Sequence, residues 1–244
     1  MPAFTTPAIV IRRADYSDYD RMITLFSPEL GRIDAIARGC RRPKSPLVNA
    51  VEPFTSGEFQ LYAHRERMSL EQCQISDSYY ELRSDYDRLC HGVYWLKLLD
   101  AAILPDTPAP ELFITTLRAL AHLNYGELPP ALVTMAFEMH FMTINGFAPR
   151  MDACMICGRP VDGDARFDVD LGGAVCLQCP SGAPKVSNGA RRIIMKLPRT
   201  QFDKFQLVNE RPEWPEAARL FRLYMDDRMH LGRFAPPLYA PDRK

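Results

Sequence analysis

The sequence lacks any long apolar run. Its first residues, MPAFTTPAIVIRRADY, hold no apolar stretch of signal-peptide length, and no stretch of about 18 apolar residues occurs anywhere in the chain. Neither secretion nor a transmembrane helix is therefore expected. Cysteine is scarce and odd in number, with seven residues, which argues against a disulfide framework. Together these absences predict a cytoplasmic protein.

Motifs of the common enzyme classes are absent too. The chain contains no Walker loop, no Rossmann G-x-G-x-x-G, no nucleophile elbow and no kinase signature. The five histidines are scattered without ligand spacing, and His140 lies in an apolar segment that favours a core position. The neighbouring carboxylates Asp226 and Asp227 lie beside arginines, which is typical of a solvated helix face. We therefore predict no catalytic residue and no enzymatic activity.

The chain also lacks an excess of charge of either sign. Thirty basic and thirty acidic residues give a formal net charge of zero at pH 7. The balance hides a pattern, because residues 81–184 carry seven basic and thirteen acidic residues whereas residues 185–244 carry thirteen basic and seven acidic ones. A polyanionic partner would therefore meet local basic patches and not a basic protein as a whole.

Five short segments in the first eighty residues have the composition of β-strands. They are β-branched or alternate apolar with polar residues, and turn-rich joints separate them. The predicted strands are PAIVIRR, RMITLF, RIDAIAR, FTSGEFQLYA and MSLEQCQISDS. Five strands in this length are typical of a small barrel, for which an OB-fold is the natural candidate and an SH3-like barrel or a sandwich the alternative.

From about Glu81 the apolar spacing becomes helical. One helix is predicted from there to Pro105, and a second begins at Pro110. A third, ALVTMAFEMHFMTINGF, is apolar nearly all round, so we expect it at the centre of a bundle. Further helices are predicted at residues 190–196 and 215–231, followed by a Pro-rich tail that is expected to be extended or disordered.

Two C-x-x-C pairs lie eighteen residues apart in the segment between these helices: Cys154 with Cys157, and Cys176 with Cys179. Two turns that each offer a thiolate pair supply the four ligands of a tetrahedral zinc site, and this spacing is typical of one. Between the pairs, ARFDVDL alternates like a strand and Gly172-Gly173 resembles a hairpin turn, so we expect a zinc ribbon. Free buried thiols and a redox dithiol are the alternatives. Four thiolates leave no open position for a substrate, which makes the predicted zinc structural.

These patterns predict an α+β multidomain protein. The N-terminal OB-fold β-barrel is expected at residues 1–80, and an α-helical bundle domain at residues 81–150 and 185–244. The four-cysteine zinc ribbon, residues 151–184, is inserted in the helical domain.

A basic cluster lies in GRIDAIARGCRRPKSPL, at the end of a predicted barrel strand and in the loop after it. In an OB-fold this region forms the usual oligonucleotide groove, where arginines follow phosphates and aromatic rings stack on bases. The candidate nucleic-acid contacts are Arg32, Arg38, Arg41, Arg42 and Lys44, with Phe54, Phe59 and Tyr62 as possible stacking residues on the next strand. The alternatives are an ordinary solvated surface for the charges and core positions for Phe54 and Phe59.

Two further basic groups follow the cysteines. The first consists of Arg191, Arg192, Lys196 and Arg199, and the first three of these are also candidate nucleic-acid contacts. The second consists of Arg219, Arg222 and Arg228, whose spacing predicts a basic stripe along one side of the last helix.

The segment GRIDAIARGCRRPKSPLVNAVEPF resembles the RecO family, in which a G-R-x4-A-x-G-x-R-R-x-K-S stretch leads to a strand that opens with an apolar-x-P-F pattern. The resemblance continues through GVYWLKLLDAAILPDTPAPELFITTLRAL and FEMHFMTINGFAPRMDACMICG, so it spans nearly the whole chain in order. The family's architecture is an OB-fold, a helical domain and, in many members, a zinc ribbon. With all four cysteines present, this chain resembles a zinc-containing member.

The resemblance implies a bacterial, nucleoid-associated mediator of recombinational DNA repair in the RecF pathway. Such a protein binds single- and double-stranded DNA, anneals complementary strands and forms a complex with RecR. It helps to load recombinase onto DNA coated with single-strand binding protein (SSB) and contacts the acidic, apolar C-terminal tail of SSB. No small-molecule substrate and no membrane partner are implied.

Two other interpretations remain. The chain could be a zinc-ribbon scaffold that contacts only proteins, in which case reversing the basic cluster would leave DNA binding unaffected. It could also be a nuclease or hydrolase built on the barrel, but the acids of residues 1–80 are dispersed and do not form the carboxylate cluster that Mg²⁺ needs.

Overall fold

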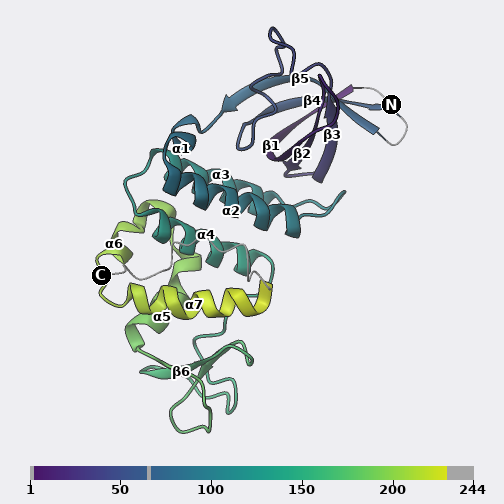
Figure 1. Ribbon diagram of the computed structural model, residues 1–244. Coiled ribbons are helices and arrows are strands. Elements are labelled where there is room, and N and C mark those ends of the chain that lie inside the picture. Colours follow the sequence, from purple (N-terminus) through teal and green to yellow (C-terminus); the bar gives the residue numbers. More distant parts are fainter. Residues whose placement is uncertain (1–2, 65–66, 230–244) are drawn as a thin grey trace. The chain divides into compact units, whose positions relative to one another are not determined.

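Figure 1 shows the computed structural model, which describes residues 3–64 and 67–229. By its internal contacts the chain forms two compact units, Met1–Tyr125 and Gly126–Lys244. The first unit holds a β-barrel and three helices, and the second holds the remaining helices and a small three-stranded sheet. The fold is therefore α+β, as the sequence predicts.

The first unit is built on a closed barrel with the strand order β1-β2-β3-β5-β4. β1 pairs antiparallel with both β2 and β4, whereas β3 and β5 run parallel. This topology is that of an OB-fold, which confirms the prediction against the SH3-like barrel and the sandwich. The strands are β1 (Ala3–Asp15), β2 (Arg21–Ser27), β3 (Gly31–Ala37), β4 (Ser56–His64) and β5 (Arg67–Asp77).

The alternation of β3 determines which of its side chains reach the barrel surface. Ile33, Ala35 and Ala37 are buried in the barrel core. Because successive residues of a strand point to opposite faces, Arg32 and Asp34 lie on the outside. The first residue of the predicted basic cluster is thus on the outer face of the barrel.

Three helices complete the first unit: α1 (Tyr80–Ser84), α2 (Tyr86–Ala102) and α3 (Pro110–Tyr125). The single helix predicted from Glu81 to Pro105 is wrong at one point, because the chain breaks at Asp85. The Asp85 side chain accepts hydrogen bonds from the N–H groups of Asp87 and Arg88, so it caps α2 and ends α1.

The turn between β2 and β3 fits closely against the segment that joins α2 to α3. The N–H of Arg32 donates to the carbonyl of Leu104 (3.1 Å), and the N–H of Asp106 donates to the carbonyl of Leu30 (3.0 Å). Gly31 has a φ of 63°, and a Cβ there would collide with the carbonyl oxygens of Leu104 and Thr107. Glycine at this position lets the barrel and the helices make direct backbone contact.

In the second unit, α4 and α5 pack against α7. Almost the whole circumference of α4 is buried, as its apolar sequence predicts. The short segments η1, η2 and α6 are absent from the sequence prediction, since three or four residues show no helical period. The helical elements are α4 (Pro130–Ile144), α5 (Asn188–Lys196), η1 (Leu197–Arg199), η2 (Phe202–Lys204), α6 (Gln206–Asn209) and α7 (Trp214–Met229).

The ribbon of the second unit is a sheet of very short strands in the order β7-β6-β8. Its strands are β6 (Ala165–Asp168), β7 (Gly173–Val175) and β8 (Lys185–Val186). The predicted alternation holds as far as Phe167, which is buried, but Leu171 is exposed because the chain already turns after Asp168. The hairpin expected around Gly172-Gly173 is present, with β6 and β7 antiparallel.

The C-terminal end of the chain is only partly described. The predicted Pro-rich tail, residues 233–244, and the predicted last residue of the final helix, Leu231, lie outside the described residues. Within residues 3–64 and 67–229, every helix is too short or too polar to cross a membrane.

Candidate functional site

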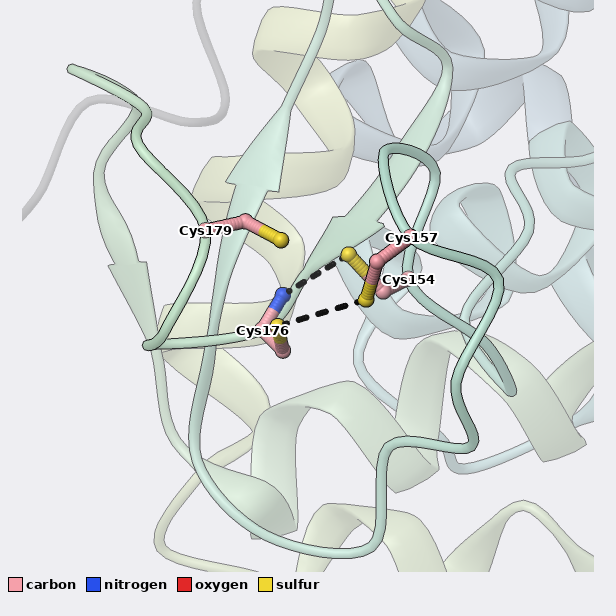
Figure 2. Close-up of side chains that lie close together, drawn as sticks. All are labelled: Cys154, Cys157, Cys176 and Cys179. Carbon is pink, nitrogen blue, oxygen red and sulfur yellow. Dashed lines mark hydrogen bonds between the residues drawn. The ribbon is translucent and has the colours of Figure 1, made fainter.

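Four cysteine side chains of the second unit converge on one point. Their Sγ atoms all lie within 4.8 Å of one another, and Figure 2 shows the pair Cys154 and Cys157 facing the pair Cys176 and Cys179. The Sγ atoms of Cys157 and Cys176 are 3.8 Å apart. Four sulfurs about 2.3 Å from a zinc ion would stand about 3.8 Å from one another, so this spacing fits tetrahedral coordination.

The ribbon sheet holds the two cysteine pairs in register. Cys176 follows directly after β7, and its N–H donates to Cys154 Sγ (3.3 Å). The N–H of Met155 donates to the carbonyl of Ala174 in β7 (2.8 Å), which fixes the first cysteine loop to the same strand. Gly158 then closes that loop with a φ of 72°, where a side chain would be strained.

The pKa values of Cys154 and Cys179 shift in opposite directions, because the four thiols lie close together and cannot all ionise easily. Burial opposes ionisation of Cys154, but hydrogen bonds from the backbone of Cys157, Cys176 and Ile156 overcome it and lower its pKa to about 6. The hydrogen bond with Cys176, together with burial, raises the pKa of Cys179 to about 12. A divalent cation at this point would stabilise all four thiolates at once and so lower the pKa of every thiol. The four cysteines can therefore hold a metal ion, and a four-sulfur set leaves no open coordination position.

On the barrel, the segment between β3 and β4 carries most of the predicted basic residues, and all four of them are exposed. We call these residues the basic loop: Arg38, Arg41, Arg42 and Lys44. Arg41 forms an ion pair with Asp15 (3.4 Å) and donates to the carbonyl of Ser17 (3.0 Å). The Arg42 guanidinium lies over the ring of Tyr19, 5.1 Å from its centroid. The loop is thus held against the turn between β1 and β2.

Arg32, the fifth predicted contact on the barrel, is already neutralised by carboxylates. Its guanidinium forms ion pairs with Asp34 (3.1 Å) and with Asp100 of α2 (2.6 Å). These contacts make Arg32 a link between the barrel and α2. We expect it to hold phosphate less well than the basic loop does.

The aromatic residues predicted to stack on bases are mostly in the core. Phe54 and Phe59 are buried, and Phe54 precedes β4, so the alternative interpretation of both as core residues is correct; Tyr62 of β4 is exposed. Tyr16 and Tyr19, in the turn that holds the basic loop, are exposed aromatic residues that the sequence interpretation missed. The only signal for them was the presence of two large aromatic residues in a predicted turn.

Arg191 of the second unit does not face solvent, in contrast to the position expected of a nucleic-acid contact. Its side chain is buried, with the residue only 4% exposed. The guanidinium donates to the carbonyls of Met151 (2.6 Å) and Gly163 (3.2 Å), and to Asn188 Oδ1 (2.9 Å). Burial lowers the pKa of Arg191, and the residue fastens α5 to the ribbon instead of facing solvent.

The predicted basic stripe on α7 is also not formed. Arg222 is buried and pairs with Glu138 of α4 (3.3 Å) and with Asp226 (2.9 Å). Arg228 donates to the carbonyls of Val169 and Asp170 in the ribbon. Only Arg219 of the three is exposed, because the other two lie on faces that pack against neighbouring segments.

Arg192 and Lys196 are exposed, and they border a groove of about 700 Å³ that is formed by α5, η1, α6 and the residues around them. The groove has apolar surface from Ile193, Leu197, Leu207 and Val208. Its charged lining residues are Arg192, Lys196, Lys204 and Arg211, with Asp164 and Glu213 as the acids. Cations outnumber carboxylates there, so the groove offers apolar contact together with positive charge.

Comparison with known proteins gives a consistent result along the chain. Residues 1–79 match the model of the family "Recombination protein O N terminal", and residues 83–234 match "Recombination protein O C terminal". The chain is 34% identical over 211 residues to a protein of Desulfitobacterium hafniense named DNA repair protein RecO, covering 84% of this chain and 77% of that protein. Proteins with the same name are 33% identical over 230 residues in Anaeromyxobacter sp. (92% and 90% covered) and 28% identical over 228 residues in Acetivibrio thermocellus (92% and 91%).

Proposed function

The chain belongs to the RecO family of DNA repair proteins, and from this premise we propose that it is a non-enzymatic mediator of recombination that binds DNA through its barrel. It binds single and double strands, anneals complementary strands and, with RecR, helps to load recombinase onto SSB-coated DNA in the RecF pathway. Its ribbon holds a structural zinc ion. The protein works in the bacterial cytoplasm, on nucleoid DNA.

The exposed basic loop on the OB-fold is the observation that supports this proposal. Arg38, Arg42 and Lys44 form no ion pair or hydrogen bond through their side chains within the described part of the chain. Asp20 interacts electrostatically with Arg38 and Arg42, but it is one carboxylate beside several exposed cations, so the loop keeps positive charge for phosphates. Holding two strands along such cations lowers their mutual repulsion and raises their local concentration. The bases then supply the specificity of annealing, and the protein needs to make or break no bond.

Reversing the basic loop tests the proposal. We expect the Arg38→Glu/Arg41→Glu/Arg42→Glu variant to bind labelled single-stranded DNA on the order of tenfold or more weakly at low salt, because three phosphate contacts become repulsive. In a salt series followed by fluorescence anisotropy, each phosphate on a single strand contributes about −0.7 to the log–log slope, so the slope should flatten by about 2. Strand annealing should slow in parallel.

The control is a variant with the same change in net charge away from the loop, Arg118→Glu/Lys185→Glu/Arg219→Glu, whose three side chains are all exposed. It should bind DNA like the wild type. Equal binding by both variants would move the DNA site off the barrel, and a wild type that binds no DNA at low salt would favour the protein-only scaffold. Degradation of the labelled DNA that depends on a divalent cation would instead favour the alternative interpretation of the protein as a nuclease.

The groove beside α5 is the place in the second unit whose chemistry suits the SSB tail. A peptide that ends in acidic residues and Phe needs an apolar pocket with a basic border, and the groove offers both. We therefore assign Arg192 and Lys196 to this peptide in preference to DNA. The assignment leaves the basic loop on the barrel as the main DNA contact.

A labelled acidic peptide with a C-terminal Phe should bind the wild type and lose roughly tenfold in affinity with Arg192→Glu or Lys196→Glu, since charge-assisted contacts contribute about 1.5–3 kcal/mol each. Arg199→Glu is the matched control, because Arg199 is exposed on the next turn and does not line the groove. Equal loss with all three variants would indicate general attraction between opposite charges. No loss with any of them would place the peptide elsewhere.

A further inference from the structure

The turn between β1 and β2 exposes two aromatic rings at the edge of the barrel. Tyr16 and Tyr19 are each 54% exposed. The turn itself is ordered by hydrogen bonds, from the N–H of Tyr16 to the carbonyl of Asp20 (3.1 Å) and from the N–H of Asp20 to Ser17 Oγ (3.2 Å). The rings therefore stand on a defined backbone without contributing their surface to the core.

This turn is joined to the basic loop by main-chain contacts. The N–H of Arg41 donates to the carbonyl of Tyr19 (3.1 Å), and the N–H of Gly39 donates to Asp20 Oδ1 (2.8 Å). The second bond lowers the pKa of Asp20, so this carboxylate stays ionised and the bond is charge-assisted. Because these contacts use backbone atoms and Asp20, they do not depend on the tyrosine side chains.

The side chains of the two segments also meet. Arg42 covers one face of the Tyr19 ring, which leaves the ring in a fixed position next to a cation. Arg38 and Lys44 are exposed in the same loop. Aromatic surface and phosphate-binding charge are thus presented together, at one of the loop positions through which OB-folds bind oligonucleotides.

We propose that Tyr16 and Tyr19 stack on unpaired bases and thereby give this site a preference for single strands over duplex. The proposal rests on the DNA binding proposed above and names the side chains that distinguish single-stranded from duplex DNA. A duplex keeps the faces of its bases inside the stack, so only a single strand can offer them to a tyrosine ring. The basic loop, in contrast, attracts the phosphates of either form.

The test compares Tyr16→Ala/Tyr19→Ala with the wild type on single-stranded and duplex DNA, by anisotropy across a salt series. Base–aromatic stacking contributes about 1–3 kcal/mol per base, so we expect the single-strand affinity to fall by roughly fivefold or more per ring lost. The salt slope should be unchanged, because no phosphate contact is removed, and duplex affinity should stay the same. Tyr16→Phe/Tyr19→Phe should bind like the wild type.

Two controls separate stacking from a structural effect. Tyr80→Ala/Tyr86→Ala removes two exposed tyrosines of the same unit, on α1 and α2, and should leave DNA binding intact. An oligonucleotide with abasic positions should bind the wild type more weakly than intact DNA does, whereas the Tyr16→Ala/Tyr19→Ala variant should bind both about equally.

The outcomes distinguish the two proposals. A wild type that binds neither single strands nor duplex overturns the DNA-binding function and this inference with it. A wild type that binds DNA while the alanine variant keeps its single-strand affinity, or loses affinity for both forms equally, overturns the assignment of the tyrosines alone.

Discussion

Replacing Cys176 by serine is expected to prevent the four-cysteine site from holding a metal ion and to unfold the ribbon. The ribbon strands β6, β7 and β8 have only four, three and two residues, so the sheet supplies little stability of its own and depends on its packing against α7 and on a cross-link between the cysteine pairs. Binding of a structural zinc ion to four thiolates supplies an apparent free energy of roughly 10–16 kcal/mol at neutral pH, which is folding free energy for such a segment.

Unfolding of the ribbon should also destabilise α5 and α7, the helices that contact it. Arg191 of α5 and Arg228 of α7 donate to carbonyls of the ribbon and its flanking segments, so an unfolded ribbon leaves both guanidinium groups without those acceptors. Protons compete with the metal for the thiolates, and we therefore expect metal affinity to fall as the pH is lowered.

Metal content by elemental analysis and unfolding during a chelator titration check this prediction. In a Trp95→Phe background the remaining tryptophan, Trp214 at the start of α7, reports on the second unit. Cys90→Ser, in α2 of the first unit, is the matched control and should keep the metal. Purified protein that contains no metal, with a Cys176→Ser variant that melts like the wild type, would contradict the prediction.

The cysteine site and the barrel could be predicted well from the sequence, because the patterns that indicate them are local. Ligands two residues apart within each pair and a Gly-Gly turn between the pairs describe the ribbon without reference to the rest of the fold. The alternation of Ile33, Ala35 and Ala37 likewise states which face of β3 is buried. In both cases the pattern lies within one or two elements, so tertiary structure has little opportunity to override it.

The basic residues show where this reasoning stops. Arg191 and Arg192 are adjacent in α5, yet one is buried and the other exposed, because Ala190, Arg191 and Ile194 share the face that packs inward. Composition treats both arginines alike, and only their packing partners distinguish them. The break at Asp85 is similar, since a capping side chain interrupts an apolar period that continues on both sides.

Tyr16 and Tyr19 illustrate a third limit. The role proposed for them depends on a contact between the turn that holds them and the basic loop, and no periodicity of the sequence records such a contact. Arg42 over Tyr19 and Arg41 bonded to the backbone of that turn become visible only once the barrel is closed.

The buried ion pair between α4 and α7 should carry the second-largest effect on stability. Glu138 is fully buried and Arg222 is only 7% exposed, with Nη1 of the arginine 3.3 Å from Oε1 of the glutamate. Arg222→Met would leave a carboxylate inside the helical core without this cation. Breaking a buried pair in this way costs about 3–5 kcal/mol, because the carboxylate loses its cation while it stays removed from water.

Since the two units need not unfold together, hydrogen exchange measures this effect better than a single melting curve. Amides of α4 and α7 should lose protection in Arg222→Met, while those of α2 keep theirs. Arg219→Met, one turn earlier on α7 and exposed, is the matched control and should change stability by no more than about 0.5 kcal/mol. The double variant Glu138→Leu/Arg222→Met should be more stable than Arg222→Met alone, because it no longer holds the buried carboxylate of Glu138. If Arg222→Met exchanged like the control, the pair would lie in a solvated cleft, and the charges would add nothing to the packing of α4 on α7.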